Sequence, residues 1–261
     1  MNYFVEGLQG SGKSTLVKKL SEIHPDYQVL REGDYSPVEL AWCAYMTQEK
    51  YQEVLDRYES LRQEILEKTH EEGDRKIVRY TQIHTDVPGF YQDLEQYEIY
   101  NNRVDFDEWK RIILSRYETW NSDKNIFECS LFQNIVEDMI LFRCASDEEI
   151  IEFYREIKET LKGHEFRIFY LKTEDIPANI GVIRKERSDD QGNELWFPMM
   201  IGYFNDSPYA KKYGISGEEG LMAHLKHRQD LELKLMREVF PDCCVVLPSK
   251  KYGDIREAAE A

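Results

Sequence analysis

The sequence predicts an α/β fold built on a five-stranded parallel sheet flanked by helices. Short apolar runs of strand length recur along the chain, and segments with the apolar spacing of helices separate them. A glycine-rich segment stands between the first such run and the first helical pattern, as expected for a strand–loop–helix unit. The runs predicted as strands are Tyr3–Val5, Tyr27–Leu30, Asn125–Phe127, Phe166–Leu171 and Cys243–Leu247.

The helices are predicted from apolar spacing and from start signals. Apolar residues recur at helical spacing over residues 51–66 and 109–120. The segments Ser146–Glu149 and Ser216–Glu219 fit capping boxes, in which a serine and a glutamate three residues later satisfy free backbone N–H groups. Two of the later helices are therefore predicted to begin there.

Two segments exceed what a minimal sheet-and-helix core needs. Residues 36–120 are rich in Tyr and Glu and are predicted to form a helical insertion on the substrate side. Residues 181–217 carry five glycines and are predicted to form a mobile lid, because loops of that length are usually functional or disordered. We expect both to belong to a single domain over residues 1–261, since this length suits one sizeable core.

Residues 7–14 read Gly-Leu-Gln-Gly-Ser-Gly-Lys-Ser, a complete G-x-x-x-x-G-K-[ST] phosphate-binding pattern. Glycines let backbone N–H groups turn toward one centre, and the following helix N-terminus adds partial positive charge. Lys13 would reach the β- and γ-phosphates, and the Ser14 hydroxyl would ligate Mg²⁺. The sequence therefore predicts bound ATP and Mg²⁺. The residues expected to bind the nucleotide are Gly7, Gln9, Gly10, Ser11, Gly12, Lys13, Ser14 and Thr15.

The net charge and the cysteine content limit which partners and which compartment are expected. The net charge of −16 repels nucleic-acid backbones and anionic lipid, whereas a small phosphorylated ligand can be met locally by a few cations. The five cysteines form no C-x-x-C pair, as expected for thiols in a reducing cytosol. The first residues already read as strand and loop, and no apolar run approaches the roughly 18 residues of a membrane span. We expect a cytoplasmic protein with a small-molecule substrate, and leave homodimer formation open.

Residues Glu6–Thr15 resemble the opening of the thymidylate kinase and deoxynucleoside kinase branch of P-loop kinases, which read E-G-x-x-G-x-G-K-S-T after a strand. Leu30–Gly33 is similar to that branch's R-E-P element, and Phe127–Ser130 to its E-R-S motif. Arg184–Arg187 resembles its basic lid. The resemblance implies a P-loop NTPase fold and phosphoryl transfer. We expect the strand order 2-3-1-4-5, with the loop at the C-terminal edge of the sheet.

The resemblance implies roles for three carboxylates. Glu32 would be the general base, because a carboxylate near the acceptor hydroxyl can take its proton. Asp34 is a rival for that role, and both residues also fit an ordinary turn. Glu128 would hold the metal or orient the acceptor, and its structural alternative is a helix cap.

Three basic residues of the lid-like segment, Arg184, Lys185 and Arg187, would neutralise charge on the transferring phosphoryl group. Their structural alternative is solvated helix charge. The full predicted sets are Lys13, Glu32, Arg184 and Arg187 for catalysis, Asp34, Glu128 and Lys185 for substrate binding, and Ser14 and Glu128 for the metal.

One position departs from the family pattern in a way that leaves the acceptor open. Cys129 stands where the family usually has Arg, and Arg79, Arg103 or Arg143 could supply the missing cation. The leading expectation is an ATP- and Mg²⁺-dependent kinase of a nucleoside or nucleotide. The alternatives are a kinase of a non-nucleoside metabolite or antibiotic hydroxyl, and a nucleotide-binding regulator or slow NTPase.

Overall fold

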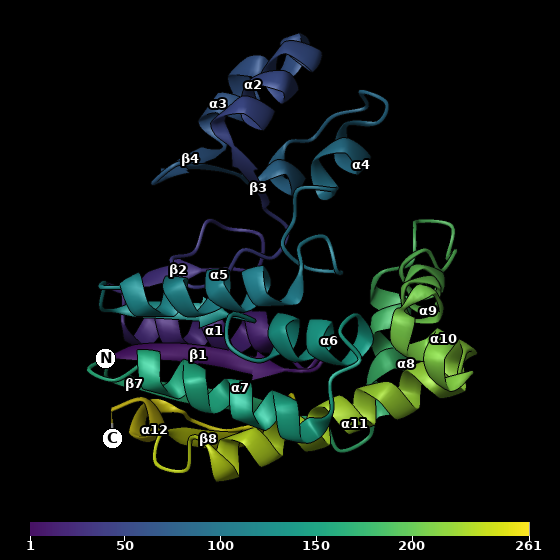
Figure 1. Cartoon of the computed structure of the whole chain (residues 1–261). Coiled ribbons are helices and arrows are strands. Elements are labelled where there is room, and N and C mark those ends of the chain that lie inside the picture. Colours follow the sequence, from purple (N-terminus) through teal and green to yellow (C-terminus); the bar gives the residue numbers. More distant parts are fainter. Residues whose placement is uncertain (261) are drawn as a thin grey trace. The chain divides into compact units, whose positions relative to one another are not determined.

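The computed structural model describes residues 1–260, and the chain divides into two compact units (Figure 1). The main unit is formed by Met1–Val29 and Asn121–Ala261, and the inserted unit by Leu30–Trp120. The boundaries of the inserted unit lie close to those of the predicted insertion at residues 36–120. The single domain expected over residues 1–261 stays a prediction.

The main sheet contains five parallel strands in the order β2-β6-β1-β7-β8. In chain numbering this differs from the predicted 2-3-1-4-5, because the inserted unit contributes three strands that the sequence analysis did not find. The segments predicted as strands are those that form this sheet. Their bounds are Asn2–Gly7 (β1), Gln28–Leu30 (β2), Asn125–Glu128 (β6), Phe166–Lys172 (β7) and Cys244–Pro248 (β8).

Strand β1 is buried along its whole length, as expected for a central parallel strand covered on both faces. Its register with β6 and β7 places Val5 opposite Glu128 and Gly7 opposite Leu171. The carboxyl ends of the three strands therefore meet at one edge of the sheet. On one face Phe4 stacks on Phe127 with ring centroids 4.9 Å apart.

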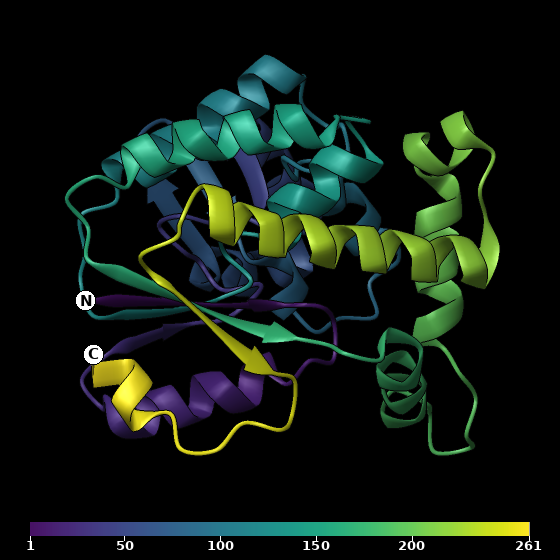
Figure 2. The ribbon, with the colours of Figure 1, turned by 90° about the horizontal axis from the view of Figure 1, so that it is seen from below.

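Helices cover both faces of this sheet. Figure 2 shows α1 and α12 on one face and α7 and α11 on the other. The first pair encloses an apolar cluster that joins Val17 and Leu20 of α1 to Val5 of the sheet. The helices of the main unit are Lys13–Ile23 (α1), Gln133–Leu141 (α6), Asp147–Thr160 (α7), Ile176–Glu186 (α8), Trp196–Asp206 (α9), Pro208–Tyr213 (α10), Gly217–Glu238 (α11) and Arg256–Glu260 (α12).

One of the two predicted capping boxes is confirmed. Ser146 and Glu149 bond reciprocally at the start of α7. The box predicted at Ser216 is wrong, since that side chain makes no capping hydrogen bond. Instead, the side chain of Asn205 accepts a hydrogen bond from the Gly217 N–H at 2.8 Å. A residue of α9 therefore satisfies a free backbone N–H at the start of α11.

The segment predicted as a lid is mostly helical. Residues 181–217 contain the end of α8, all of α9 and α10, and an antiparallel bridge between Ser188 and Glu194. Glycines at 181 and 202 lie inside helices rather than in loops. Movement of this segment stays a prediction. No helix within residues 1–260 combines the length and apolar character needed to cross a bilayer.

The inserted unit has its own core and its own sheet. The antiparallel order is β3-β5-β4, so the insertion predicted as helical contains a sheet as well as helices. Each of these strands has only four residues, and Thr69–Glu72 contains no apolar residue, so they gave little apolar signal. The elements are Ala44–Thr47 (β3), Gln48–Arg57 (α2), Arg62–Glu67 (α3), Thr69–Glu72 (β4), Arg75–Val78 (β5), Phe90–Glu95 (α4) and Phe106–Thr119 (α5), with short 3-10 helices at Glu59–Leu61 and Tyr80–Gln82.

The capping box gives a stability prediction. Ser146→Ala removes the acceptor for the Glu149 N–H, which lies 3.3 Å from the serine hydroxyl. We expect the free energy of unfolding to fall by about 1 kcal/mol, the usual cost of losing an N-cap side chain. Urea unfolding followed by circular dichroism measures it. Glu152→Ala, on the exposed face of the same helix, should stay within about 0.5 kcal/mol of the wild type; equal losses in both variants would contradict the prediction.

Candidate functional site

The segment between β1 and α1 forms a tight loop whose backbone conformation requires glycine. Gly7 and Gly10 have φ angles of 137° and 69°, which L side chains rarely adopt. A Cβ on Gly7 would lie 2.7 Å from the Leu171 carbonyl oxygen, and one on Gly10 would lie 2.1 Å from Ile183 Cδ1. The loop therefore packs directly against β7 and α8.

The Lys13 side chain folds over this loop. Its Nζ donates hydrogen bonds to the carbonyl oxygens of Gly7 (2.8 Å) and Leu8 (3.0 Å), and to Gln133 Oε1 (2.9 Å). Lys13 is buried, and the three acceptors are neutral oxygens. Hydrogen bonds to neutral oxygens do not neutralise the ammonium, so positive charge remains at the loop.

Ser14 and Glu128 form the second feature of the site. Glu128 is the last residue of β6, and its Oε1 accepts a hydrogen bond from the Ser14 hydroxyl at 2.6 Å. A hydroxyl and a carboxylate are hard oxygen donors of the kind that Mg²⁺ prefers. Within residues 1–260 no group of three or more His, Cys, Asp or Glu side chains could hold a metal. A Mg²⁺ held by this pair would take its other ligands from phosphate and water.

Glu6, fully buried one residue before the loop, fixes the connection that follows β6. Its carboxyl oxygens accept from the backbone N–H groups of Leu131 (2.7 Å) and Gln133 (3.2 Å). Burial raises the pKa of Glu6 to about 8, although these bonds and the charge of Lys13 act in the opposite direction. Glu6 is therefore mostly protonated at neutral pH and acts through Gln133, which the sequence analysis missed.

A buried arginine holds the loop from α11. Arg228, fully buried, donates to Gln9 Oε1 at 2.9 Å and forms ion pairs with Glu137 and Glu232. Burial alone would raise the pKa of Glu137, yet Arg228 and then His224 lower it to about 2. Glu137 is therefore ionised and compensates the arginine. Nothing in the local sequence relates Arg228 to a loop 219 residues away.

Two further side chains bond to loop carbonyl oxygens. Asn179 of α8 donates to the Gln9 carbonyl at 2.8 Å, and Ser249, just after β8, donates to the Ser11 carbonyl at 2.9 Å. The loop is thus fixed by elements from three later parts of the main unit: α8, α11 and the end of β8.

The predicted lid residues lie on and beside α8, which also contacts the loop through Ile183 and Asn179. Arg184 is bonded to carboxylates, with Nη2 2.8 Å from Glu194 and Nη1 3.3 Å from Glu218. Lys185 and Arg187 are exposed, and the Arg187 guanidinium lies 5.0 Å from the centre of the Trp196 ring. The structure therefore places Arg184 and Lys185 on the helix that contacts the loop, and Arg187 directly after it.

Glu32 and Asp34 belong to the inserted unit. Glu32 is exposed, and its Oε1 accepts from the Trp42 indole N–H at 3.1 Å. Asp34 accepts from the Gln82 amide at 2.8 Å and from the Arg31 backbone N–H at 2.9 Å, which closes a turn. The structure brings Lys13, Ser14 and Glu128 together in the main unit, while a base role for Glu32 or Asp34 stays a prediction.

Cys129 cannot act as the cation that the family pattern has there. It is buried with a φ of 60°, and its N–H donates to the Val5 carbonyl. Of the replacements considered, Arg143 donates to Asp138 at 2.9 Å and both side chains are buried. Arg103 is paired with Glu95. Arg79, in the inserted unit, has its Nη1 3.2 Å from Gln82 Oε1.

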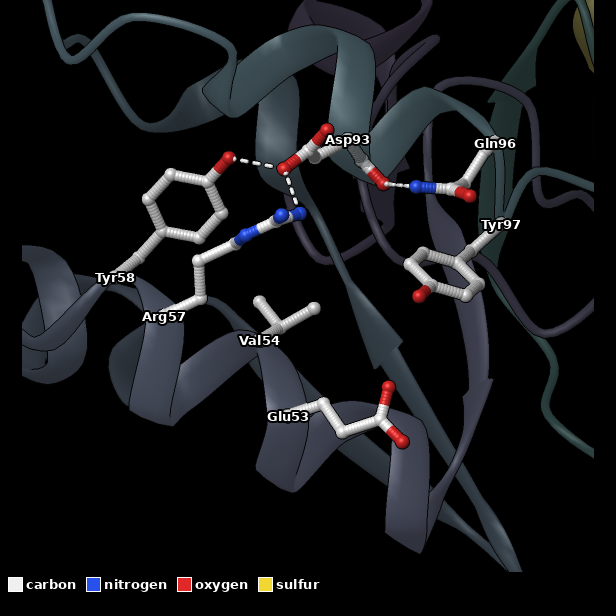
Figure 3. A pocket seen from close by; sticks show the side chains of 7 residues that line it. All are labelled: Glu53, Val54, Arg57, Tyr58, Asp93, Gln96 and Tyr97. Atoms are coloured by element: carbon white, nitrogen blue, oxygen red, sulfur yellow. Dashed lines mark hydrogen bonds and ion pairs between the residues drawn. The ribbon is translucent and has the colours of Figure 1, made fainter.

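A separate pocket of about 250 Å³ lies in the inserted unit, and Figure 3 shows the side chains that line it. Tyr58 and Arg57 both direct their donors at Asp93 Oδ2, at 2.6 and 2.5 Å. Arg57 and Asp93 therefore neutralise each other, while Glu53 pairs with Lys50 outside the lining, and none of the predicted site residues lines the pocket.

The buried carboxyl gives a pH-dependence prediction. The folded protein keeps a proton on Glu6 that the unfolded chain releases near its ordinary pKa of 4.5. The free energy of unfolding of the wild type, taken relative to Glu6→Gln, should therefore fall as the pH rises from about 5 to about 8. Urea titrations at several pH values measure this difference. Glu22→Gln, at an exposed position of α1, should show no such trend; a flat difference for Glu6→Gln would refute the assignment.

No protein-family model matches the chain, and no curated protein matches it as a relative.

Proposed function

We propose that the protein is an ATP- and Mg²⁺-dependent phosphotransferase that acts on a small molecule, with a nucleoside or nucleotide as the leading acceptor class. The observation that carries this proposal is the Ser14–Glu128 hydrogen bond of 2.6 Å beside the Lys13-bearing loop. It joins a loop hydroxyl to a carboxylate at the end of the neighbouring parallel strand. The P-loop NTPase fold is part of the proposal and is supported by the parallel sheet and the strand–loop–helix unit.

The loop residues 7–15 would hold the triphosphate. Phosphate oxygens would replace the neutral carbonyl and amide oxygens as acceptors for Lys13 Nζ, which strengthens each bond because both partners are then charged. Ser14 and Glu128 would hold Mg²⁺, which when bound neutralises negative charge on the phosphates. Phosphoryl transfer needs mainly such positioning and charge stabilisation.

The remaining residues are assigned by chemistry. Glu32 or Asp34 would accept the proton of the acceptor hydroxyl. Arg184, Lys185 and Arg187 would stabilise developing charge, and Arg184 would first have to leave Glu194 and Glu218. A non-nucleoside acceptor is the second candidate, because a buried Cys129 replaces the expected cation.

Lys13→Ala tests the phosphotransferase. We expect kcat/KM for ADP formation, measured against a panel of nucleosides, monophosphates and other alcohols, to fall by about 10²–10³-fold or more. The circular dichroism spectrum should be unchanged. Lys18→Ala, at an exposed position of the same helix, should keep full activity. Full activity of Lys13→Ala would exclude the proposal, and nucleotide binding without transfer to any panel member would favour a regulator or slow NTPase.

Glu32→Gln and Asp34→Asn separate the two candidate bases. The variant that removes the base should lower kcat by about 10²–10⁴-fold with little change in the KM for ATP. Because Asp34 also accepts from Gln82 and Arg31, Asp34→Asn should lower thermal stability as well, whereas Glu32→Gln should not. Steady-state kinetics of phosphoryl transfer give kcat and KM, and thermal unfolding curves give the stability. Equal, unchanged kcat in both variants would remove both residues from the mechanism.

A further inference from the structure

Two cations of the inserted unit converge on one neutral oxygen. Lys68 Nζ lies 3.4 Å from Gln82 Oε1, and Arg79 Nη1 lies 3.2 Å from the same atom. The backbone strengthens this arrangement, since the Arg79 N–H donates to the Lys68 carbonyl at 3.0 Å. Lys68 directly precedes β4, and Arg79 directly follows β5. The paired strands β4 and β5 therefore place the Lys68 and Arg79 side chains next to the same Gln82 amide oxygen.

Gln82 is itself fixed in place. Its Nε2 donates to the Gly33 carbonyl at 3.0 Å and to Asp34 Oδ1 at 2.8 Å. With both bonds made by the amide nitrogen, the amide oxygen must point toward the cations. The same glutamine thus connects the pair of cations to Asp34, one of the two candidate bases.

These cations lack the carboxylate partners that other basic side chains of this unit have. Arg57, Arg62 and Arg116 pair with Asp93, Asp56 and Glu72 respectively. Among the residues the structure describes, neither Lys68 nor Arg79 has a carboxylate oxygen within 4.0 Å, and the buried Arg79 Nε has no hydrogen-bond partner. The chain has a net charge of −16, so carboxylates are abundant. Two neighbouring cations without a carboxylate partner are therefore unusual in this protein.

The charge of Arg79 also acts on a neighbouring ring, that of His70. The His70 ring stacks on Tyr35 with centroids 4.0 Å apart. Burial and then the positive charge of Arg79 lower the pKa of His70, while Glu72 acts in the opposite direction. A partly buried guanidinium and an ammonium that share one neutral oxygen retain most of their capacity to bind an anion.

We propose that Lys68, Arg79 and Gln82 form a binding site for an oxyanion, phosphate or carboxylate, carried by the phosphoryl acceptor. This rests on the proposed function, and it narrows the acceptor class to anionic molecules such as a nucleoside monophosphate. Of the arginines considered as replacements at position 129, Arg103 and Arg143 are paired with carboxylates, whereas Arg79 is the one available to a ligand.

The binding test does not need kinase activity. Inorganic phosphate and acetate are each titrated by calorimetry into full-length Lys13→Ala protein, in which the loop lysine no longer contributes. The same titration is made with Arg79→Gln or Lys68→Gln added, and with Arg62→Gln as the matched control, because Arg62 is partly exposed and paired with Asp56. We expect the affinity for one of the anions to fall about ten-fold or more for the first two additions and to be unchanged for the control.

The outcomes separate the two anions and the two proposals. Tighter binding of phosphate assigns a phosphorylated acceptor, and tighter binding of acetate assigns a carboxylate acceptor. Equal affinities with and without Arg79→Gln and Lys68→Gln, or binding of neither anion, would overturn the site.

A kinetic arm uses the protein with Lys13 intact. Arg79→Gln should raise the KM for the acceptor about ten-fold and leave the KM for ATP unchanged. Absence of transfer to any acceptor would count against the proposed function alone, because the anion titration stands independently. Transfer to a neutral acceptor that is unaffected by Arg79→Gln would refute the anionic acceptor while preserving the phosphotransferase.

Discussion

The geometry of the candidate site depends on the buried carboxyl of Glu6. Its two oxygens hold the backbone N–H groups of Leu131 and Gln133, and Gln133 then bonds to the ammonium of Lys13. One side chain thus fixes the β6–α6 connection relative to the end of β1. Because burial keeps this carboxyl protonated near neutral pH, it supports the loop without cancelling the charge that a phosphate would meet.

The buried charges around Arg228 position the loop more than they stabilise the fold. Taking a guanidinium and a carboxylate out of water costs several kcal/mol per ion, and their attraction repays this only when the geometry is good. Arg228 meets Glu137 and Glu232, and Tyr170 donates to Glu232 at 2.5 Å. A hydrophobic side chain would fill that space at lower cost, but it could not donate to Gln9. The arrangement is best explained by the need to hold the loop.

The sequence predicted what is local and missed what is distant. The strand, the loop and the helix through residue 23 are contiguous, and Glu128 could be found because it ends a recognisable strand. Gln133 and Arg228 reach the loop from 120 and 219 residues away, so no local pattern relates them to it. The sheet of the inserted unit escaped because strands such as Thr69–Glu72 are stabilised by pairing and carry almost no apolar alternation. The cap predicted at Ser216 was wrong because the distant Asn205 accepts the hydrogen bond of the Gly217 N–H.

Both proposed anion sites place cations on neutral oxygens, and this explains how so acidic a chain could bind an anion. Lys13 rests on carbonyl and amide oxygens, and Lys68 and Arg79 rest on an amide oxygen. Exchanging such an acceptor for a charged oxygen strengthens the bond, so a ligand competes well. Arg184 differs, because its partners Glu194 and Glu218 are already charged, and an incoming phosphate gains little by replacing them. Binding energy in this protein should therefore come mainly from Lys13 and Arg79, while Arg184 contributes only where movement of its own helix first separates it from those carboxylates.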